Sequence, residues 1–574
     1  MSLAAVCRRL GKVDRRASAL AFALALAALF VRLDGLGERS FGHPENYIAG
    51  VPMPEWVHPN ARRTDLGGVV EGMRTDGHPP LYFAFMLAWT GLFGHGLVAL
   101  RLPSALLGAA SVALVYRLAL RAGDRRTALL AGGLVALSGL HVYWSQLARM
   151  YVPTSFLVLA STLLLVRLRE APRPALAWGY GLTTAAALWT QLYAWPAIAA
   201  QALWIAWRGL RRRAVPAAVP ALACALIAAV PVVAQLLHRT ATVNEFQQSP
   251  WGYFALGHAF STRLPFWGAA PAAPVPATWL AAGTLALLLL ALARPSQPAM
   301  EAGREVEFLA ARPGRVIFAG LAALALASMF AVWRFVSWAA MAGPVRPAVV
   351  ACALLPLGLA AVTGVLLVRT AAPRRLTATG TDAADDARGL VAVLAVAPLL
   401  LMVAVSRFHG ALVDRGTVVF LPYLLLLVAV GARACGRRPW LPAVVSVALL
   451  AVSVASLAHY RRAQATPRDY AGLARELAHH LAPEDLVLLD SSYRDPPLLY
   501  YFGDAHHQFA LRRRWRQLAA PSPSRLWIVA WDRDALAEPP GGTVPGFRPT
   551  ATVLRAHHAA AALHLRRART VEGR

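Results

Sequence analysis

Ionisable side chains that could do chemistry are concentrated in a polar stretch between residues 34 and 101. It contains SFGHPENY (Ser40–Tyr47) and TDGHPPLYF (Thr75–Phe83), and it runs up to RLPS (Arg101–Ser104). Carboxylates and imidazoles can exchange protons with a reacting group, and guanidiniums can stabilise negative charge. Almost everything else in the chain is apolar, so this stretch is where such groups can meet at a membrane surface.

The composition is that of a polytopic helical membrane protein. Of the 574 residues, 57% are hydrophobic and 15% are charged, whereas soluble domains carry about 25% charged residues. Many apolar runs approach the ~20 residues that a helix needs to cross a bilayer. Much of the net charge of +28 comes from arginine clusters between these runs, as cytoplasmic loops require. We therefore expect a lipid bilayer as a partner and no nucleic acid.

Placing every strong arginine cluster in the cytoplasm predicts about 13 transmembrane helices. The first, residues 17–33, follows a basic start and has no small-residue cleavage site, so we interpret it as an uncleaved span with the amino end inside. The others are expected at residues 102–120, 127–143, 152–166, 174–190, 194–209, 214–236, 276–294, 315–333, 346–368, 389–405, 416–432 and 440–458.

The same alternation of spans, with arginine clusters in the cytoplasm, predicts that the polar stretch 34–101 lies on the outer side of the membrane. Only one full crossing fits between His78 and the basic run at Arg117. The aromatic-rich helix predicted at 81–94 is therefore expected to lie in the membrane interface, with a short span as the alternative. Further outer-facing candidates are His43, Asp65, Glu71, His409 and Asp414.

Two domains are predicted, a transmembrane domain at 1–458 and an extracytoplasmic domain at 459–574. The second is less apolar, with an amphipathic helical pattern at 468–481 and buried-strand patterns at 485–490 and 525–532. The expected fold class is thus all-α and polytopic, with a small soluble α/β domain at the C-terminus.

Three motifs around the second predicted span resemble a known family. They are HPPLYF (His78–Phe83), RLPSALLGAASVALVYRLALR (Arg101–Arg121) and YWSQLARMY (Tyr143–Tyr151). They resemble the C-type (GT-C) integral-membrane glycosyltransferases of family 39, which are related to the protein O-mannosyltransferases and to the lipid A aminoarabinose transferase. Residues 414–431 and 468–489 resemble later segments of the same family more weakly.

The resemblance implies a GT-C-like membrane body and a reaction at the periplasmic face of a bacterial inner membrane. A sugar linked to a polyprenyl (undecaprenyl) phosphate would be the donor, and an acceptor hydroxyl would displace the phosphate with inversion. The acceptor would be lipid A or another glycolipid, a polysaccharide or a protein. The sequence has no visible loop for a nucleotide phosphate, which fits a lipid-linked donor.

The family uses a carboxylate in the first outer loop as the base or to orient the acceptor. An Asp-Glu pair is usual there, and this chain has Pro44 and Glu45, so we predict Glu45 as the catalytic carboxylate. Asp76, two residues before His78, is the alternative. The structural interpretation of Glu45 is a carboxylate that stabilises the free N–H groups at a helix start.

Basic residues would hold the leaving phosphate, because the planar fork of arginine can bind two of its oxygens. The predicted ones are His78, Arg101, Arg149 and Arg415. Each has a structural alternative as well, such as bonding to loop backbone for His78 or snorkelling to the interface for Arg149. The substrate groove is predicted to include Tyr47, Tyr82, Gln146 and Tyr151.

Two other functions compete with transfer. A catalytically inactive relative that binds lipid is favoured by Pro44 and by Leu147, which stands where the family often has a carboxylate. A transporter or flippase would need charged residues within several spans and internal repeats, and neither is prominent. No cofactor is predicted with certainty. A divalent metal ion stays open, since no ligand spacing is diagnostic.

Overall fold

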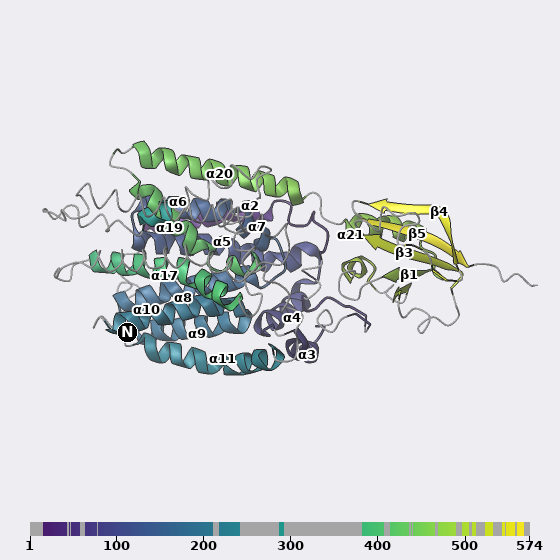
Figure 1. Cartoon of the computed structure of the whole chain (residues 1–574), viewed down its shortest axis with the longest axis horizontal. Helices are drawn as coiled ribbons and strands as arrows, with labels where there is room; N and C mark the ends of the chain where they lie inside the picture. Colours follow the sequence, from purple (N-terminus) through teal and green to yellow (C-terminus); the bar gives the residue numbers. More distant parts are fainter. Residues whose placement is uncertain are drawn as a thin grey trace, which may run out of the picture. The chain divides into compact units, whose positions relative to one another are not determined.

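The computed structural model describes most of residues 15–566 and gives both units of the chain (Figure 1). The described residues exclude 43–44, 46–47, 55, 58–62, 77, 211–216, 241–285, 292–380, 407–413, 436–437, 439, 465–468, 490–495, 504–507, 513–522, 532–541, 543, 546 and 557–558. The predicted spans 315–333 and 346–368 lie outside the described residues, as does most of 276–294.

The chain divides into two compact units. Unit 1 consists of Met1–Arg32, Ser104–Ser145 and Met150–Tyr460. Unit 2 consists of Leu33–Pro103, Gln146–Arg149 and Arg461–Arg574. Unit 2 thus combines most of the polar stretch that opens the sequence argument with the C-terminal segment.

Unit 1 is built from apolar helices that run side by side (Figure 1). They are α2 (Arg15–Leu33), α5 (Leu97–Ala122), α6 (Arg125–Leu137), α7 (Gly139–Ser145), α8 (Tyr151–Glu170), α9 (Pro174–Thr190), α10 (Trp195–Leu210), α11 (Ala218–Thr240), α17 (Thr381–Ser406), α18 (Asp414–Thr417), α19 (Leu421–Ala434) and α20 (Trp440–Gln464). The mostly helical class is confirmed. Within the described residues, 4 helices are long and apolar enough to cross a membrane, or up to 5 with one bent pair, so the count of thirteen stays a prediction.

The predicted span at 127–143 is a broken one. α6 and α7 meet at Ser138 with a bend of 57°. The bend releases backbone carbonyls that a continuous helix would bond. The Arg32 guanidinium from α2 donates to two of them, those of Val135 and Ala136, at 3.3 and 3.2 Å. It also bonds to Ser145 Oγ and His141 Nδ1, so one buried arginine holds the break together.

Ion pairs connect four helix ends that the charge pattern predicts to lie on the same side of the membrane. Asp386 at the start of α17 forms ion pairs with Arg169 of α8 and Arg208 of α10. Arg121 near the end of α5 pairs with Glu170 of α8 at 3.0 Å. Because α5, α8 and α10 finish where α17 begins, their predicted alternation across the membrane is internally consistent.

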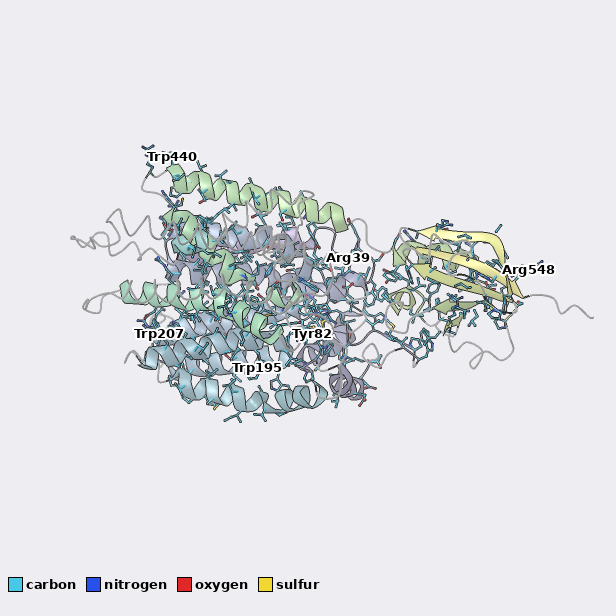
Figure 2. All side chains as sticks on the ribbon, viewed as in Figure 1. Arg39, Tyr82, Trp195, Trp207, Trp440 and Arg548 are labelled. Atoms are coloured by element: carbon cyan, nitrogen blue, oxygen red, sulfur yellow. The ribbon has the colours of Figure 1, made fainter. Side chains whose placement is uncertain are left out.

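Tryptophans mark the two ends of α10. Trp207, in its last turn, lies at the same end of unit 1 as Trp440, the first residue of α20, whereas Trp195 lies at the other end (Figure 2). Trp207 and Trp440 are 37% and 54% exposed. Indole rings at helix ends with exposed faces are typical of side chains at a membrane interface.

Unit 2 contains two short helices from the polar stretch. α3 (Leu66–Asp76) was not predicted, and it begins beside Asp65, whose carboxylate accepts from Gly68 N–H at 2.6 Å. α4 (Leu81–Phe93) occupies the position of the helix predicted at 81–94. Gly50, at φ 89°, packs so tightly on α4 that a Cβ there would lie 1.8 Å from Thr90 Oγ1.

The apolar surface of α4 is consistent with an interfacial position. Its 13 residues are fewer than the ~20 needed for a span. Leu92 and Phe93 are 78% and 58% exposed, as side chains that meet lipid would be. Its interfacial placement remains a prediction, because no membrane is part of the structure.

The C-terminal part of unit 2 is the predicted α/β domain. Its sheet has the order β2-β1-β3-β5-β4. The strands are β1 (Leu486–Leu489), β2 (Phe509–Leu511), β3 (Arg525–Trp531), β4 (Phe547–Ala556) and β5 (Ala559–Arg566). β1 pairs in parallel with β2 and β3, and β5 pairs antiparallel with β3 and β4. The presence of a small C-terminal sheet domain is thereby confirmed.

One face of the sheet carries the main core of this domain. Helix α21 (Tyr470–His480) and the short helix η7 (Pro496–Tyr501) pack there. The polar stretch contributes to the same core, since Val57 is buried in it and Met53 and Trp56 pack against it. Met53, Trp56 and Val57 are therefore folded together with a domain that lies more than 400 residues later in the sequence.

Candidate functional site

Glu45 and Arg101 form a buried ion pair within unit 2. Glu45 lies in the loop between α2 and α3, and Arg101 is in the second turn of α5. Arg101 Nε donates to Glu45 Oε1 at 2.8 Å and Nη2 donates to Oε2 at 2.7 Å, and both side chains are fully buried. This side-on arrangement uses the planar fork of the guanidinium.

All remaining donors of Arg101 are also used. Nη1 donates to the carbonyls of Leu36 and Arg39 at 2.9 and 2.8 Å, and Nη2 donates to that of Ser40 at 3.1 Å. A guanidinium has five N–H donors, so none is left for a phosphate in this arrangement. Arg101 therefore has a structural role, which is to organise the loop backbone.

The carboxylate of Glu45 is equally saturated. Besides Arg101, Oε1 accepts from the backbone N–H of Ala148 at 3.1 Å and Oε2 accepts from that of Gly42 at 3.2 Å. Burial raises the pKa of Glu45, but the charge of Arg101 and these hydrogen bonds outweigh it and leave the pKa below its ordinary value. At neutral pH Glu45 is therefore a fixed carboxylate.

The bond to Ala148 connects this pair to a third predicted site residue. Arg149 is the next residue and is 3% exposed. On the other side, Gln146 Nε2 donates to the carbonyl of Asp34 at 2.7 Å. The segment Gln146–Arg149 is thus attached to the first loop at both ends, and the structure brings Glu45, Arg101, Gln146 and Arg149 together.

His78 and Tyr82 lie beside the start of α4. Both rings contact Phe83 edge to face, with centroids 6.2 and 5.6 Å away. The guanidinium of Arg63, fully buried, stacks on the same Phe83 ring at 3.8 Å. Asp76 is the last residue of α3, but its side chain is outside the described part of the chain, as is Tyr47.

The other two predicted site residues lie in unit 1. Tyr151 begins α8 and Arg415 lies in α18. Rings connect them, because Tyr151 packs on Trp144 and on Tyr193 with centroids 4.6 and 6.3 Å apart, and the hydroxyl of Tyr193 is hydrogen-bonded to Arg415. Gly416 leaves room for this ring, since a Cβ there would come within 2.7 Å of Tyr193.

Tyr193 is a site candidate that the sequence analysis missed. It lies in η3 (Leu192–Ala194), between two apolar helices. An isolated tyrosine between spans has no distinctive spacing, so only its contact with Arg415 identifies it. The signal that was available is Gly416 directly after Arg415, where a close approach of another group is required.

No three His, Cys, Asp or Glu side chains come together as a metal site among the described residues. Within unit 2 the structure brings together the carboxylate of Glu45 with Arg101 and Arg149, and within unit 1 it brings together Tyr151, Tyr193 and Arg415. Paired carboxylates and arginines can fix a loop, arginines can hold an anion, and tyrosine rings can stack on a sugar or lipid.

Comparison with known families gives one sequence match. Residues 77–238 match the family described as dolichyl-phosphate-mannose-protein mannosyltransferase. The matched region includes His78, Tyr82, Arg101, Gln146, Arg149 and Tyr151. It confirms the predicted resemblance to the GT-C glycosyltransferases. No curated protein matches the chain.

Solved structures with similar chain traces have low sequence identity. ArnT from Cupriavidus metallidurans in the apo state is 16% identical, with 96% of this chain and 98% of that chain covered and a TM-score of 0.40. Its complex with undecaprenyl phosphate is 15% identical, with 94% of this chain and 97% of that chain covered and a TM-score of 0.37. The oligosaccharyltransferase AglB from Archaeoglobus fulgidus, in complex with an inhibitory peptide and a dolichol-phosphate, is 11% identical. In this comparison 88% of this chain and 69% of that chain are covered, and the TM-score is 0.38.

Proposed function

We propose that this protein is a membrane glycosyltransferase that moves a sugar from a polyprenyl phosphate to an acceptor hydroxyl. The observation that supports it best is the family match over residues 77–238, because that region holds most of the predicted site residues. In the reaction the acceptor oxygen attacks the anomeric carbon, the bond from that carbon to the phosphate oxygen breaks, and a carboxylate takes the hydroxyl proton.

Arg149, His78 and Arg415 are proposed to hold the leaving phosphate. The phosphate gains negative charge as its bond to the sugar breaks, so donors placed in advance stabilise the transition state. Arg149 is fixed by the bond between Ala148 and Glu45, and Arg415 by its bond to Tyr193. Arg101 acts indirectly, by fixing Glu45 and the loop backbone at Leu36–Ser40.

The base is proposed to be Asp76, with Glu45 fixing the loop. A base needs a free lone pair and a pKa near the working pH. Glu45 has hydrogen-bond partners on both oxygens and a lowered pKa. Asp76 was the alternative carboxylate in the sequence, and it precedes His78, a proposed phosphate ligand, by two residues.

The reaction is tested with purified protein in lipid nanodiscs and a radiolabelled pool of undecaprenyl-phosphate sugars. The proposal expects label to move to an added glycolipid, polysaccharide or protein acceptor, with free undecaprenyl phosphate appearing in equal amount. Donor binding without turnover would identify an inactive lipid-binding relative. Movement of intact donor across a sealed bilayer, without cleavage, would identify a flippase.

Orientation and location are proposed together with the chemistry. The arginine distribution supports an outer position for the loop 34–101 and the C-terminal domain, on what we propose to be the periplasmic face of a bacterial inner membrane. Cysteine labelling at exposed Asp65, which pairs only locally with Gly68, checks this side directly. A membrane-impermeant reagent should label Asp65→Cys in intact spheroplasts.

A further inference from the structure

The loop that carries Glu45 also contacts two neighbouring tyrosines of the C-terminal domain. Tyr500 and Tyr501 end the short helix η7, and all the contacts below lie within unit 2. The ring of Tyr500 stacks on that of Phe41, with centroids 4.4 Å apart and planes 8° from parallel. Phe41 is fully buried, so the two stacked rings form part of a packed interior.

A chain of hydrogen bonds runs beside this stack. The backbone N–H of Phe41 donates to the hydroxyl of Tyr501 at 2.6 Å. Tyr501 is in turn hydrogen-bonded to the side chain of Ser40, and Ser40 Oγ donates to Asp469 Oδ1 at 3.3 Å. Because Ser40 gives its proton to Asp469, the Tyr501 hydroxyl is the donor in its bond with Ser40.

The chain ends on a charged helix cap. The carboxylate of Asp469 caps α21 by accepting from Gly472 N–H at 2.7 Å, and Ala471 N–H donates to Ser40 Oγ at 3.2 Å. Consecutive hydrogen bonds polarise one another, and an ionised acceptor strengthens them further. The polar stretch is therefore tied to the helix that packs on the domain's sheet.

Both tyrosines lie near enough to the ion pair for its charges to affect their pKa values. Burial raises the pKa of Tyr500 to about 12 and raises that of Tyr501, so both hydroxyls keep their protons at neutral pH. The nearby charges also act on both pKa values, that of Arg101 lowering them and that of Glu45 raising them. Tyr500 adds a bond from its hydroxyl to the carbonyl of His95, just before α5.

We propose that Tyr500 and Tyr501 are positioning residues, through which the C-terminal domain sets the geometry of the Glu45–Arg101 loop. The inference rests on the proposed sugar transfer for its kinetic consequence, but its structural content is independent of that reaction. It assigns the C-terminal domain a part in the reaction step, beyond any role in binding an acceptor. A shift of about 1 Å in a site can cost about a hundredfold in rate.

The test compares Tyr501→Phe with the control Tyr470→Phe. Tyr470 packs against Trp531 within the domain core, with centroids 4.5 Å apart, so its variant measures general loosening of the domain. Hydrogen–deuterium exchange of a peptide containing Phe41 is measured first, in nanodiscs. Loss of one hydrogen bond should speed exchange at Phe41 roughly tenfold in Tyr501→Phe, and Tyr470→Phe should leave it unchanged.

Kinetics give the second measurement. Tyr501→Phe should lower kcat by at least about tenfold while the KM for the lipid-linked donor stays within about twofold. Ser40→Ala breaks the same chain from the loop side and should reproduce both effects if Tyr501→Phe folds poorly. Wild-type exchange at Phe41 in both variants overturns the inference. Absence of transfer by the wild type would overturn the proposed function, while the exchange data would still decide on the tyrosines.

Discussion

Every N–H donor of the Arg101 guanidinium and both oxygens of the Glu45 carboxylate are hydrogen-bonded, to one another or to the surrounding backbone. Two of the five N–H donors of Arg101 go to the carboxylate and three to carbonyls of residues 36–40. The carboxylate in turn holds the N–H groups of Gly42 and Ala148. A fully used pair that joins three separate segments defines the shape of the loop between them.

Removing one partner of this pair should strongly destabilise the protein. Arg101→Met leaves a buried carboxylate without its counter-charge, a change that costs about 3–5 kcal/mol. Thermal unfolding in detergent measures the effect. Arg121→Met is the matched control, because its pair with Glu170 is about one-third exposed and worth about 0–1 kcal/mol. Equal losses in the two variants would contradict the structural role of Arg101.

The ion pair should also give stability a defined pH dependence. The folded pKa of Glu45 lies below its unfolded value of about 4.3. Its contribution is therefore complete above that value and is lost as the pH falls through the folded pKa. Unfolding temperatures of the wild type should fall in this acidic range more steeply than those of Glu45→Gln. Parallel pH curves would show that Glu45 does not gain from ionisation in the folded protein.

Arg32 should be essential for the broken span. Arg32→Met removes a donor of the Ala136 carbonyl and of Ser145 Oγ, and one of two donors of the Val135 carbonyl, which keeps the N–H of Ser138. Each buried group that loses its partner costs about 1–3 kcal/mol. We expect a large fall in the unfolding temperature and in yield from membranes. Ser145→Ala, which removes one acceptor only, should cost far less. A neutral Arg32→Met variant would mean that another group serves these carbonyls.

Tyr193 should control the donor site through Arg415. Tyr193→Phe keeps the ring that packs on Gly416 but removes the hydroxyl bonded to Arg415. We expect the KM for the polyprenyl-phosphate sugar to rise about tenfold to a hundredfold, because a hydrogen bond to a charged group is worth about 1.5–3 kcal/mol. Tyr180→Phe, whose lost hydroxyl bonds to Gln201, is the control and should leave this KM unchanged. If Tyr193→Phe leaves the KM for the donor unchanged, Arg415 does not bind the donor phosphate.

Hydropathy predicted helices well, because burial in lipid imposes long apolar runs that are visible locally. The helix at 174–190 has the predicted bounds. The break at Ser138 was not predicted, since hydropathy continues across it and the arginine that stabilises it comes from α2. α3 was missed because Gly67 and Gly68 obscure its helical pattern.

The site was predictable as a list of residue types but not as a set of contacts. Glu45 and Arg101 were both named from motifs, yet their pairing joins positions 56 residues apart. The bond from Phe41 to Tyr501 joins positions 460 residues apart. Such long-range pairs depend on the folded chain and leave no local pattern, which is why Tyr193, Tyr500 and Tyr501 emerged only from the structure.

Sugar transfer from a polyprenyl phosphate with Asp76 as base can be tested by comparing three proteins. Release of free undecaprenyl phosphate is measured for the wild type, Asp76→Asn and Glu45→Gln at equal amounts of folded protein. We expect release coupled to sugar transfer in the wild type, and a loss of about a hundredfold or more in Asp76→Asn with an unchanged unfolding temperature. In Glu45→Gln we expect the loss of release to accompany a lower unfolding temperature. Release by Asp76→Asn at the wild-type rate, or no release by the wild type, would contradict this proposal.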